Sequence, residues 1–399
     1  MSLILSDVSE TTLSQRALEI AERLASEFAQ TAVERDRRGG TAKLERDQLR
    51  ASRLLNLLIP QEFGGLGSDW PTILKIVRTF SRVDSSLGHL FGFQHLMLAT
   101  VELYGSAAQR DHAFRGTVNH DWFWGNALNP LDTGTQLTVK DGRRVINGRK
   151  GFSSGSADAD MLIVSALEPG NPRILVAAIP PGRAGVHVME DWDNMGQRQT
   201  DSGTVEFVDV EVREDELLRT PGPLGSIRAS LRSCIAQLIL SNVYLGIAEG
   251  AFGEARNYTL AQTRAWPGSG VASPNDDAYI LRHYGELFLG LQAARQSADV
   301  AALTLQRAWE SGDAITENHR GRVALDVATA KIATTRAGLD VTNRMFEVMG
   351  SRSTAGSARL DRYWRNIRTH TLHDPVDYKL RELGAWALNR TLPTPGFYS

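Results

Sequence analysis

The pattern of apolar residues changes twice along the chain, and this change limits the possible folds more than any other feature. From about Asp121 to Leu218 the apolar residues form short runs bounded by Gly, Pro and Asp, which is typical of strands joined by tight turns. On either side of this stretch they recur at spacings of three and four, as on a helix. The sequence therefore predicts an α+β fold, with a helical domain over 1–117, a β domain over 118–220 and a second helical domain over 221–399.

The two outer segments of this pattern suggest different packing from the middle one. Short strands with regularly spaced turns, such as 161–164 and 174–179, indicate an antiparallel sheet or barrel. Segments 237–264 and 322–349 are too long and too apolar for helices with a single buried face. We expect them to belong to a four-helix bundle.

Charge and cysteine content exclude several classes of protein. The formal net charge is −2, so nothing indicates general binding to nucleic acid or to an anionic membrane. A single cysteine, Cys234, excludes an internal disulfide and a cysteine-based zinc site. The first residues lack the pattern of a signal peptide, and no apolar run approaches the roughly 18 residues of a membrane span. We expect a cytoplasmic protein with no nucleic-acid or membrane partner.

Two motifs could bind phosphate or metal, but simpler interpretations are favoured. The glycine-rich run 64–67 follows a helix and lacks a surrounding βαβ unit, so it is a turn between helices and not a dinucleotide fingerprint. His370 and His373 are three residues apart and Asp374 follows, but Pro375 disfavours a helix there. No third ligand is evident nearby, so we expect a polar active-site wall or a hydrogen-bonded structural pair, and no metal site.

The densest polar stretch of the chain lies at 147–156. Its glycines, its adjacent serines and Phe152 at the end of a strand could present hydroxyl and backbone N–H groups to a flat heteroaromatic ligand. A β-turn with exposed serines explains the same residues equally well. The residues alone leave both interpretations open.

This stretch resembles the flavin segment in the β domain of acyl-CoA dehydrogenases. Residues 195–203 are similar to the next signature of that family, and residues 60–67 to its N-terminal one. The order and spacing match across nearly the whole chain. The resemblance therefore implies the acyl-CoA dehydrogenase fold: an N-terminal helical domain, a middle antiparallel β-barrel domain for flavin and substrate, and a C-terminal four-helix bundle.

Within this superfamily the chain is most similar to the flavin monooxygenases typified by dibenzothiophene monooxygenase. Segments 88–92, 125–127, 198–203 and, above all, 364–376 carry this similarity. Dehydrogenases have a Glu-Gly-Thr triplet where this chain has residues 373–375, and an alternative glutamate position corresponds to Ala236. No glutamate base is therefore visible. Asp374 could substitute in principle, although its side chain has a shorter reach.

The cofactor implied by the resemblance is FMN, with FAD less favoured. Arg352 stands where dehydrogenases have a small residue near the adenosine half of FAD, and its fork of donors suits a terminal phosphate. Arg264 is the second phosphate contact that the resemblance implies. Since one of these arginines would come from a neighbouring subunit, a homotetramer is implied as well.

The activity implied by the resemblance is oxygenation of a small or aromatic organosulfur compound by O2, through a flavin C4a-hydroperoxide. A separate NAD(P)H:flavin reductase would supply the reduced FMN. The expected catalytic residues are His89, Ser154 and His373, because histidine suits proton handling near neutral pH. The expected cofactor contacts are Asn126, Phe152, Ser153, Ser154, Trp192, Arg264, Arg352, His370 and His373. The expected substrate pocket contains Phe93, Trp124 and Leu128.

The substrate stays open at this stage. Phe93 stands where the dibenzothiophene enzymes have a tyrosine, and the loop 128–136 is shorter than theirs. A sulfinate, a sulfone, a sulfide or an amine would all be compatible. The alternatives are an FAD-dependent acyl-CoA dehydrogenase, an N-oxygenating flavin monooxygenase, or a non-catalytic scaffold, which would need none of the polar residues just named.

Overall fold

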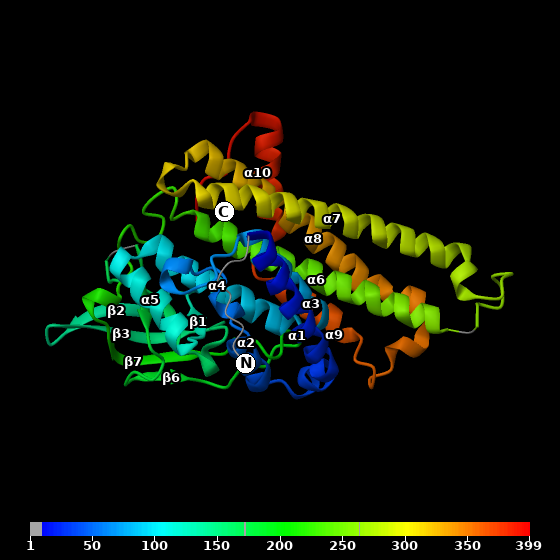
Figure 1. The fold of residues 1–399 in the computed structure, drawn as a ribbon, viewed down its shortest axis with the longest axis horizontal. Helices are drawn as coiled ribbons and strands as arrows, with labels where there is room; N and C mark the ends of the chain where they lie inside the picture. Colours follow the sequence, from blue (N-terminus) through cyan, green and yellow to red (C-terminus); the bar gives the residue numbers. More distant parts are fainter. Residues whose placement is uncertain (1–9, 171–172, 263) are drawn as a thin grey trace.

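The computed structural model describes residues 10–170, 173–262 and 264–399, and along the chain it forms a helical region, then a sheet, then a second helical region (Figure 1). The first helical region contains α1 (Glu10–Arg38), α2 (Lys43–Ala51), α3 (Trp70–Val83), α4 (Ser85–Tyr104) and α5 (Ala107–His120). The sheet contains β1 (Trp124–Ala127), β2 (Thr135–Lys140), β3 (Arg143–Lys150), β4 (Met161–Leu167), β5 (Ile174–Ile179), β6 (Val186–Val188) and β7 (Val205–Glu211). The second helical region contains α6 (Leu231–Ala261), α7 (Ala278–Glu310), α8 (Glu317–Met349), α9 (Asp361–His370) and α10 (Val376–Asn389).

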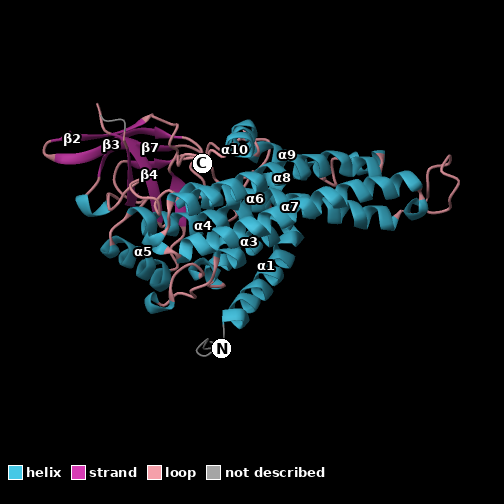
Figure 2. Cartoon of the chain, turned by 90° about the horizontal axis from the view of Figure 1, so that it is seen from above, coloured by secondary structure: helices cyan, strands magenta, loops and turns pink. Residues whose placement is uncertain are grey.

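The sheet lies at one end of the molecule, and α6, α7 and α8 extend away from it (Figure 2). The chain has two hydrophobic cores among its described residues. The larger core joins both helical regions, whereas the smaller one is formed by side chains of the strands. The helical regions thus form one packed body, and the sheet is attached to it with a core of its own.

The sheet is mixed, so the prediction of an antiparallel barrel was wrong in strand direction. The strand order is β1-β4-β2-β3-β7-β6, with β5 also paired to β4. Strand β1 pairs with β4 in parallel, and β2 meets the end of β4 in parallel as well. The reason is that β1 and β2 run in the same direction. The hairpin to β3 reverses the chain once, and the next reversal returns β4 to that direction.

Helix α4 is the central helix of the first region and the platform for part of the site. It begins after Asp84, whose carboxylate accepts hydrogen bonds from two backbone N–H groups of the first turn. Every residue of α4 except Glu102 is buried. A Cβ on Gly92 would lie 2.5 Å from the Ile239 side chain, so glycine permits close packing of α4 against α6. This close packing fixes the position of α4.

Helix α6 is long and apolar enough to cross a membrane by length and composition alone. However, 94% of its most apolar window is buried inside the protein, where it packs between α3 and α8. We therefore assign its apolar residues to the core. Its first two turns border the cavity described below.

Candidate active site

A cavity of about 640 Å³ lies where the first turns of α6, helix α4, the sheet domain and the end of α9 meet. A volume in this range suits a cofactor or a small ligand. The residues that line it are His89, Phe93, Leu96, Asn126, Leu128, Asn129, Pro130, Leu131, Phe152, Ser154, Trp192, Asp193, Asn194, Met195, Thr200, Ser202, Arg232, Ala236, Gln237, Thr369, His370, Leu372, His373, Phe397 and Tyr398.

One wall of the cavity is a chain of hydroxyl groups. The Ser154 and Thr200 hydroxyls each lie 2.7 Å from the hydroxyl of Ser202. Asn126 is next to them, because its backbone N–H donates to the Ser154 carbonyl at 2.9 Å. These groups come from β1, from the turn after β3 and from the loop before β7. They present several donors and acceptors on one side of the cavity.

Two aromatic residues border this polar wall. The rings of Phe152 and Trp192 meet edge to face, with centroids 5.8 Å apart. The Trp192 indole N–H donates to the Gln197 carbonyl at 2.8 Å, which fixes the ring. Phe152 has a φ of 54° and is 63% exposed. A bulky residue in this left-handed conformation is uncommon, and such strain often marks a ligand site.

A group of histidines forms the opposite, inner part of the lining. The His89 ring lies 4.0 Å from the Phe93 ring and 4.8 Å from the His370 ring, centroid to centroid. Neither ring nitrogen of His89 has a hydrogen-bond partner among the described residues, although both are buried. Buried polar atoms without a partner are rare, so these atoms indicate that a ligand completes the site.

Burial, together with the smaller effect of the nearby His373, lowers the pKa of His89 to about 3. His89 is therefore a neutral imidazole at neutral pH. A neutral ring does not fit the expectation that His89 titrates near neutrality, and a part for His89 in proton handling stays a prediction. A neutral ring still donates one hydrogen bond and accepts another. We therefore expect His89 to orient a ligand through such hydrogen bonds.

The lowered pKa of His89 predicts that the free energy of unfolding depends on pH. Between pH 6.5 and 3 the unfolded chain protonates His89 whereas the folded chain does not, so the free energy of unfolding should decrease as the pH falls. Each such histidine contributes a slope of up to about 1.4 kcal/mol per pH unit. His89→Phe should flatten the slope in urea titrations at pH 6, 5 and 4, whereas His187→Phe, at an exposed residue of β6, should not. An unchanged slope in His89→Phe would contradict the neutral state of His89 in the folded chain.

His373 is held by a buried ion pair. Its Nδ1 lies 2.8 Å from Asp374 Oδ1, and the Lys331 Nζ of α8 lies 3.2 Å from the same oxygen. Burial alone would raise the pKa of Asp374, but the hydrogen bond from His373 and the charge of Lys331 outweigh it and lower the pKa well below its ordinary value. The carboxylate can only accept, so His373 Nδ1 carries the proton and Nε2 is left for a ligand.

The structure brings together most of the predicted site residues. Those that line the cavity are His89, Phe93, Asn126, Leu128, Phe152, Ser154, Trp192, His370 and His373. Trp124 does not line it: this side chain is buried, and its indole N–H donates to the Thr117 hydroxyl at 2.9 Å. Ser153 is also buried outside the lining, where its hydroxyl donates to the Lys150 carbonyl.

Arg264 and Arg352 lie far from the cavity of their own chain. Both are exposed, and they follow the distal ends of α6 and α8 (Figure 1). Cavity residues occupy the first two turns of α6, which has 31 residues. Because a helix rises about 1.5 Å per residue, roughly 35–45 Å separates these arginines from the cavity. In one chain they cannot contact a ligand in it.

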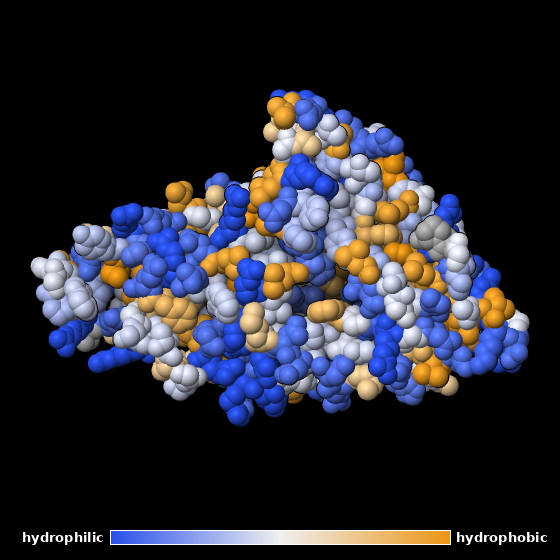
Figure 3. Space-filling view, turned by 180° about the vertical axis from the view of Figure 1, so that it is seen from behind, coloured by the Kyte–Doolittle hydropathy of each residue, from blue (hydrophilic) through white to orange (hydrophobic). Residues whose placement is uncertain are grey.

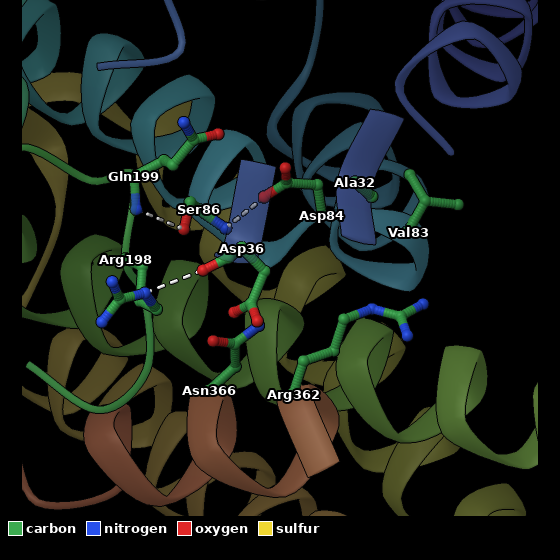
Figure 4. Close-up of a pocket in the computed structure, with 9 residues that line it drawn as sticks. All are labelled: Ala32, Asp36, Val83, Asp84, Ser86, Arg198, Gln199, Arg362 and Asn366. Carbon is green, nitrogen blue, oxygen red and sulfur yellow. Dashed lines mark hydrogen bonds between the residues drawn. The ribbon is translucent and has the colours of Figure 1, made fainter. Parts of the chain in front are cut away.

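A second, much smaller cleft of about 10 Å³ lies between α1, the start of α4 and α9 (Figure 4). It has room for about one water molecule and no larger ligand. Arg198 Nε donates to the Asp36 carbonyl at 2.7 Å, and the Asp36 carboxylate pairs with Arg359 and Arg365. These contacts hold the loop 195–203 in place. The loop in turn presents Thr200 and Ser202 to the cavity.

Several residues in or beside the cavity lining were not predicted from the sequence. Thr200 and Ser202 lie in the segment 195–203, whose similarity to a family signature could have marked them. Arg232 and Gln237 lie in the first turns of α6, which is otherwise largely apolar, so a polar residue there could have indicated a site. Lys331 gave no signal, because a single lysine in a helical pattern is ordinarily exposed.

Metal ligation is not supported for His370 and His373. The ranges that the structure describes contain no group of three or more His, Cys, Asp or Glu side chains that could hold a metal ion. The donors of the cavity instead suit a flat ligand with polar edges. Hydroxyls, Asn126 and the unpartnered His89 fit the flavin that the resemblance implies.

Comparison with known proteins agrees with the resemblance. Three family models match in succession: the acyl-CoA dehydrogenase N-terminal domain over 12–121, its middle domain over 125–210 and its C-terminal domain over 238–378. The "Probable FMNH2-dependent monooxygenase SfnC" of Pseudomonas putida is 55% identical, over 96% of this chain and 97% of its own length.

Two solved structures are similar to the whole chain. Methanesulfinate monooxygenase MsuC from Pseudomonas fluorescens is 54% identical with a TM-score of 0.94, over 96% of this chain and 99% of its own. The FMN-bound TdsC from Paenibacillus sp. A11-2, a dibenzothiophene monooxygenase, is 46% identical with a TM-score of 0.91, over 96% of this chain and 100% of its own. The similarity therefore extends over nearly the whole chain.

Proposed function

The chain belongs to the acyl-CoA dehydrogenase family, and we propose that it acts within that family as a two-component FMNH2-dependent monooxygenase of a small or aromatic organosulfur compound. It is a flavin-dependent oxidoreductase, and FMN is its cofactor. The observation that carries the proposal is the His373–Asp374–Lys331 arrangement, which stands beside the cavity where a dehydrogenase would have its glutamate base.

The side chains have separable tasks in this reaction. Bound reduced FMN would supply the two electrons and two protons with which one atom of O2 goes to sulfur and the other leaves as water. Ser154, Ser202 and Asn126 would bind the polar edge of the flavin ring, and His89 would orient it as a neutral imidazole. Phe152 and Trp192 would exclude water. Asp374 fixes one proton on His373 Nδ1, so His373 Nε2 would be free to hold or pass a proton of the reaction.

The larger assembly belongs to this proposal. A separate NAD(P)H:flavin reductase would provide reduced FMN, and O2 is the co-substrate. Exposed apolar side chains on α7 support contact with further subunits: Tyr279, Leu281, Phe288, Leu289, Val300 and Leu303. On the face opposite to that of Figure 1, apolar side chains likewise stand among hydrophilic ones around a central hollow (Figure 3).

We infer a cytoplasmic homotetramer in which α6, α7 and α8 are completed to a four-helix bundle and the sheet to a barrel-like flavin domain. The domains would span 1–117, 118–220 and 221–399. In this assembly Arg264 and Arg352 of one subunit would contact the flavin phosphate in the cavity of another. Their exposure at the distal tip of the helices is compatible with that role.

The proposal predicts oxygen transfer from O2 to sulfur. With FMN, a flavin reductase, NADH and a panel of sulfides, sulfones, sulfinates and amines, we expect at least one sulfur compound to gain one oxygen atom. Under ¹⁸O2 the mass of that product should increase by the label. The control omits the protein and keeps the reductase, because free reduced flavin also reacts with O2. Absence of any oxygenated product, or label derived from water, would contradict the proposal.

A further inference from the structure

Arg232 is a buried cation that lines the cavity without an anionic partner. It is the second residue of α6 and is 6% exposed. Its Nε donates to the Thr100 hydroxyl at 2.7 Å, and that hydroxyl donates in turn to the Leu96 carbonyl at 2.7 Å. Both contacts fix the plane of the guanidinium. The two terminal nitrogens have no hydrogen-bond partner among the residues that the structure describes.

Two other buried arginines, Arg35 and Arg46, are paired with carboxylates, and in Arg320 and Arg362 terminal nitrogens donate to carbonyl or hydroxyl oxygens. Arg35 contacts Glu45 and Asp84, and Arg46 contacts two aspartates. Arg232 has no such contact within the described ranges. A buried charge without a partner is costly, so proteins retain one mainly where a ligand supplies the opposite charge.

The surroundings of Arg232 do not neutralise it. Burial lowers the pKa of Arg232, and the only groups that oppose this shift are Tyr104 and Tyr398. Burial raises the pKa of both tyrosines, so both are neutral at neutral pH. The one carboxylate of the lining, Asp193, is exposed and makes no salt bridge with Arg232. The site therefore has a net positive charge at this end of the cavity.

The shape of this end suits a small anionic head with an apolar tail. Phe397 and Tyr398 line the cavity together with Leu96 and Phe93. A guanidinium presents its donors as a planar fork, which matches the two oxygens of a carboxylate-like or sulfinate-like group. An uncharged thiophene or sulfone would leave the buried charge unpaired.

We propose that Arg232 binds the anionic head of the substrate, and that the substrates are therefore small organosulfur oxyanions of the sulfinate type. This inference rests on the proposed function, since it identifies which organosulfur compounds the same cavity takes. The alternative source of the anion is the phosphate of the flavin. Arg232 lies at the start of α6, whereas the residues that suit the flavin ring come from the sheet domain and the loop 195–203.

Binding can be tested without turnover, using methanesulfonate as a probe whose sulfur is already fully oxidised and dimethyl sulfone as its uncharged counterpart. By calorimetry without flavin, the wild-type protein should bind methanesulfonate more tightly than dimethyl sulfone. Arg232→Met should weaken methanesulfonate binding about ten- to a hundredfold, and Arg232→Lys should restore part of it. Arg143→Met, at an exposed residue of β3, is the matched control and should bind as the wild type does.

Several outcomes overturn the inference. One is equal binding of the two probes by the wild-type protein, which decides the matter even if Arg232→Met does not fold. Another is unchanged methanesulfonate binding in Arg232→Met. A third is a loss of FMN affinity with unchanged riboflavin affinity, which would assign Arg232 to the flavin phosphate. Arg232-dependent methanesulfonate binding without oxygenation of any sulfur compound would instead support the anion site and contradict the proposed function.

Discussion

Replacing His373 by Ala is expected to reduce the rate of product formation by about two to four orders of magnitude, the usual contribution of a positioned acid–base group. His373 lines the cavity, and its other ring nitrogen, Nδ1, is fixed by a carboxylate at 2.8 Å from Asp374 Oδ1, which leaves Nε2 for the ligand. The side chain is 40% exposed, so its removal creates little cavity in the core. The thermal midpoint of unfolding should therefore change by only a few degrees.

The measurement pairs turnover with flavin binding. His373→Ala should still quench the fluorescence of added FMN, because the hydroxyl wall and Asn126 are untouched. His187→Ala removes an exposed histidine of β6 and serves as the control for loss of an imidazole. Turnover of His373→Ala within about threefold of the wild-type rate would show that the proton is handled elsewhere.

Much of the site could be predicted because its residues lie in turns with a local chemical requirement. The turn after β3 needs glycine and serine, and it carries Phe152 and Ser154 into the cavity. The loop 195–203 likewise contains local turns, and hydrogen bonds to distant residues such as Asp36 and Arg365 hold it in place. Such segments keep a recognisable pattern of small and polar residues, so a resemblance to known proteins was visible there.

Other features depend on contacts between distant residues, and no local pattern encodes them. Alternation of apolar residues predicts a strand but not its direction, so the parallel pairing of β1 with β4 was missed. Trp124 was predicted as a pocket wall next to the segment 125–127, but its indole N–H donates to the Thr117 hydroxyl. The intersubunit role of Arg264 and Arg352 requires a second chain and stays a prediction.

Lys331 is the clearest example of a residue whose place in the site no local sequence pattern predicts. It is 1% exposed on α8, and the carboxylate that makes this burial tolerable lies 43 residues further along the chain. Its Nζ also lies 3.2 Å from the Tyr244 hydroxyl, which donates to the His370 carbonyl at 2.8 Å. Lys331 therefore connects Asp374 to the backbone beside His370. Lys331 does not line the cavity, so its role is to position Asp374 and the backbone beside His370.

Replacing Lys331 by Met is expected to lower the free energy of unfolding by about 3–5 kcal/mol, since it leaves a buried carboxylate without its cation. Urea unfolding at pH 7 measures the loss, and Lys75→Met, at an exposed residue of α3, is the matched control. Adding Asp374→Asn to Lys331→Met should recover part of the stability, because no charge then stays unpaired. A double variant less stable than Lys331→Met would contradict the ion pair as the cause.

The loss of stability in Lys331→Met should itself depend on pH. The pKa of Asp374 is depressed in the fold, so its contribution to stability is present above its ordinary value of 3.8 and is lost as the pH falls below it. The hydrogen bond from His373 and the charge of Lys331 both lower this pKa, so removing Lys331 reduces the depression. The difference in stability between wild type and Lys331→Met should therefore be largest near neutral pH and should decrease as the pH falls through about 4. A difference that is constant from pH 7 to 3 would mean that lost packing, and not charge, causes the destabilisation.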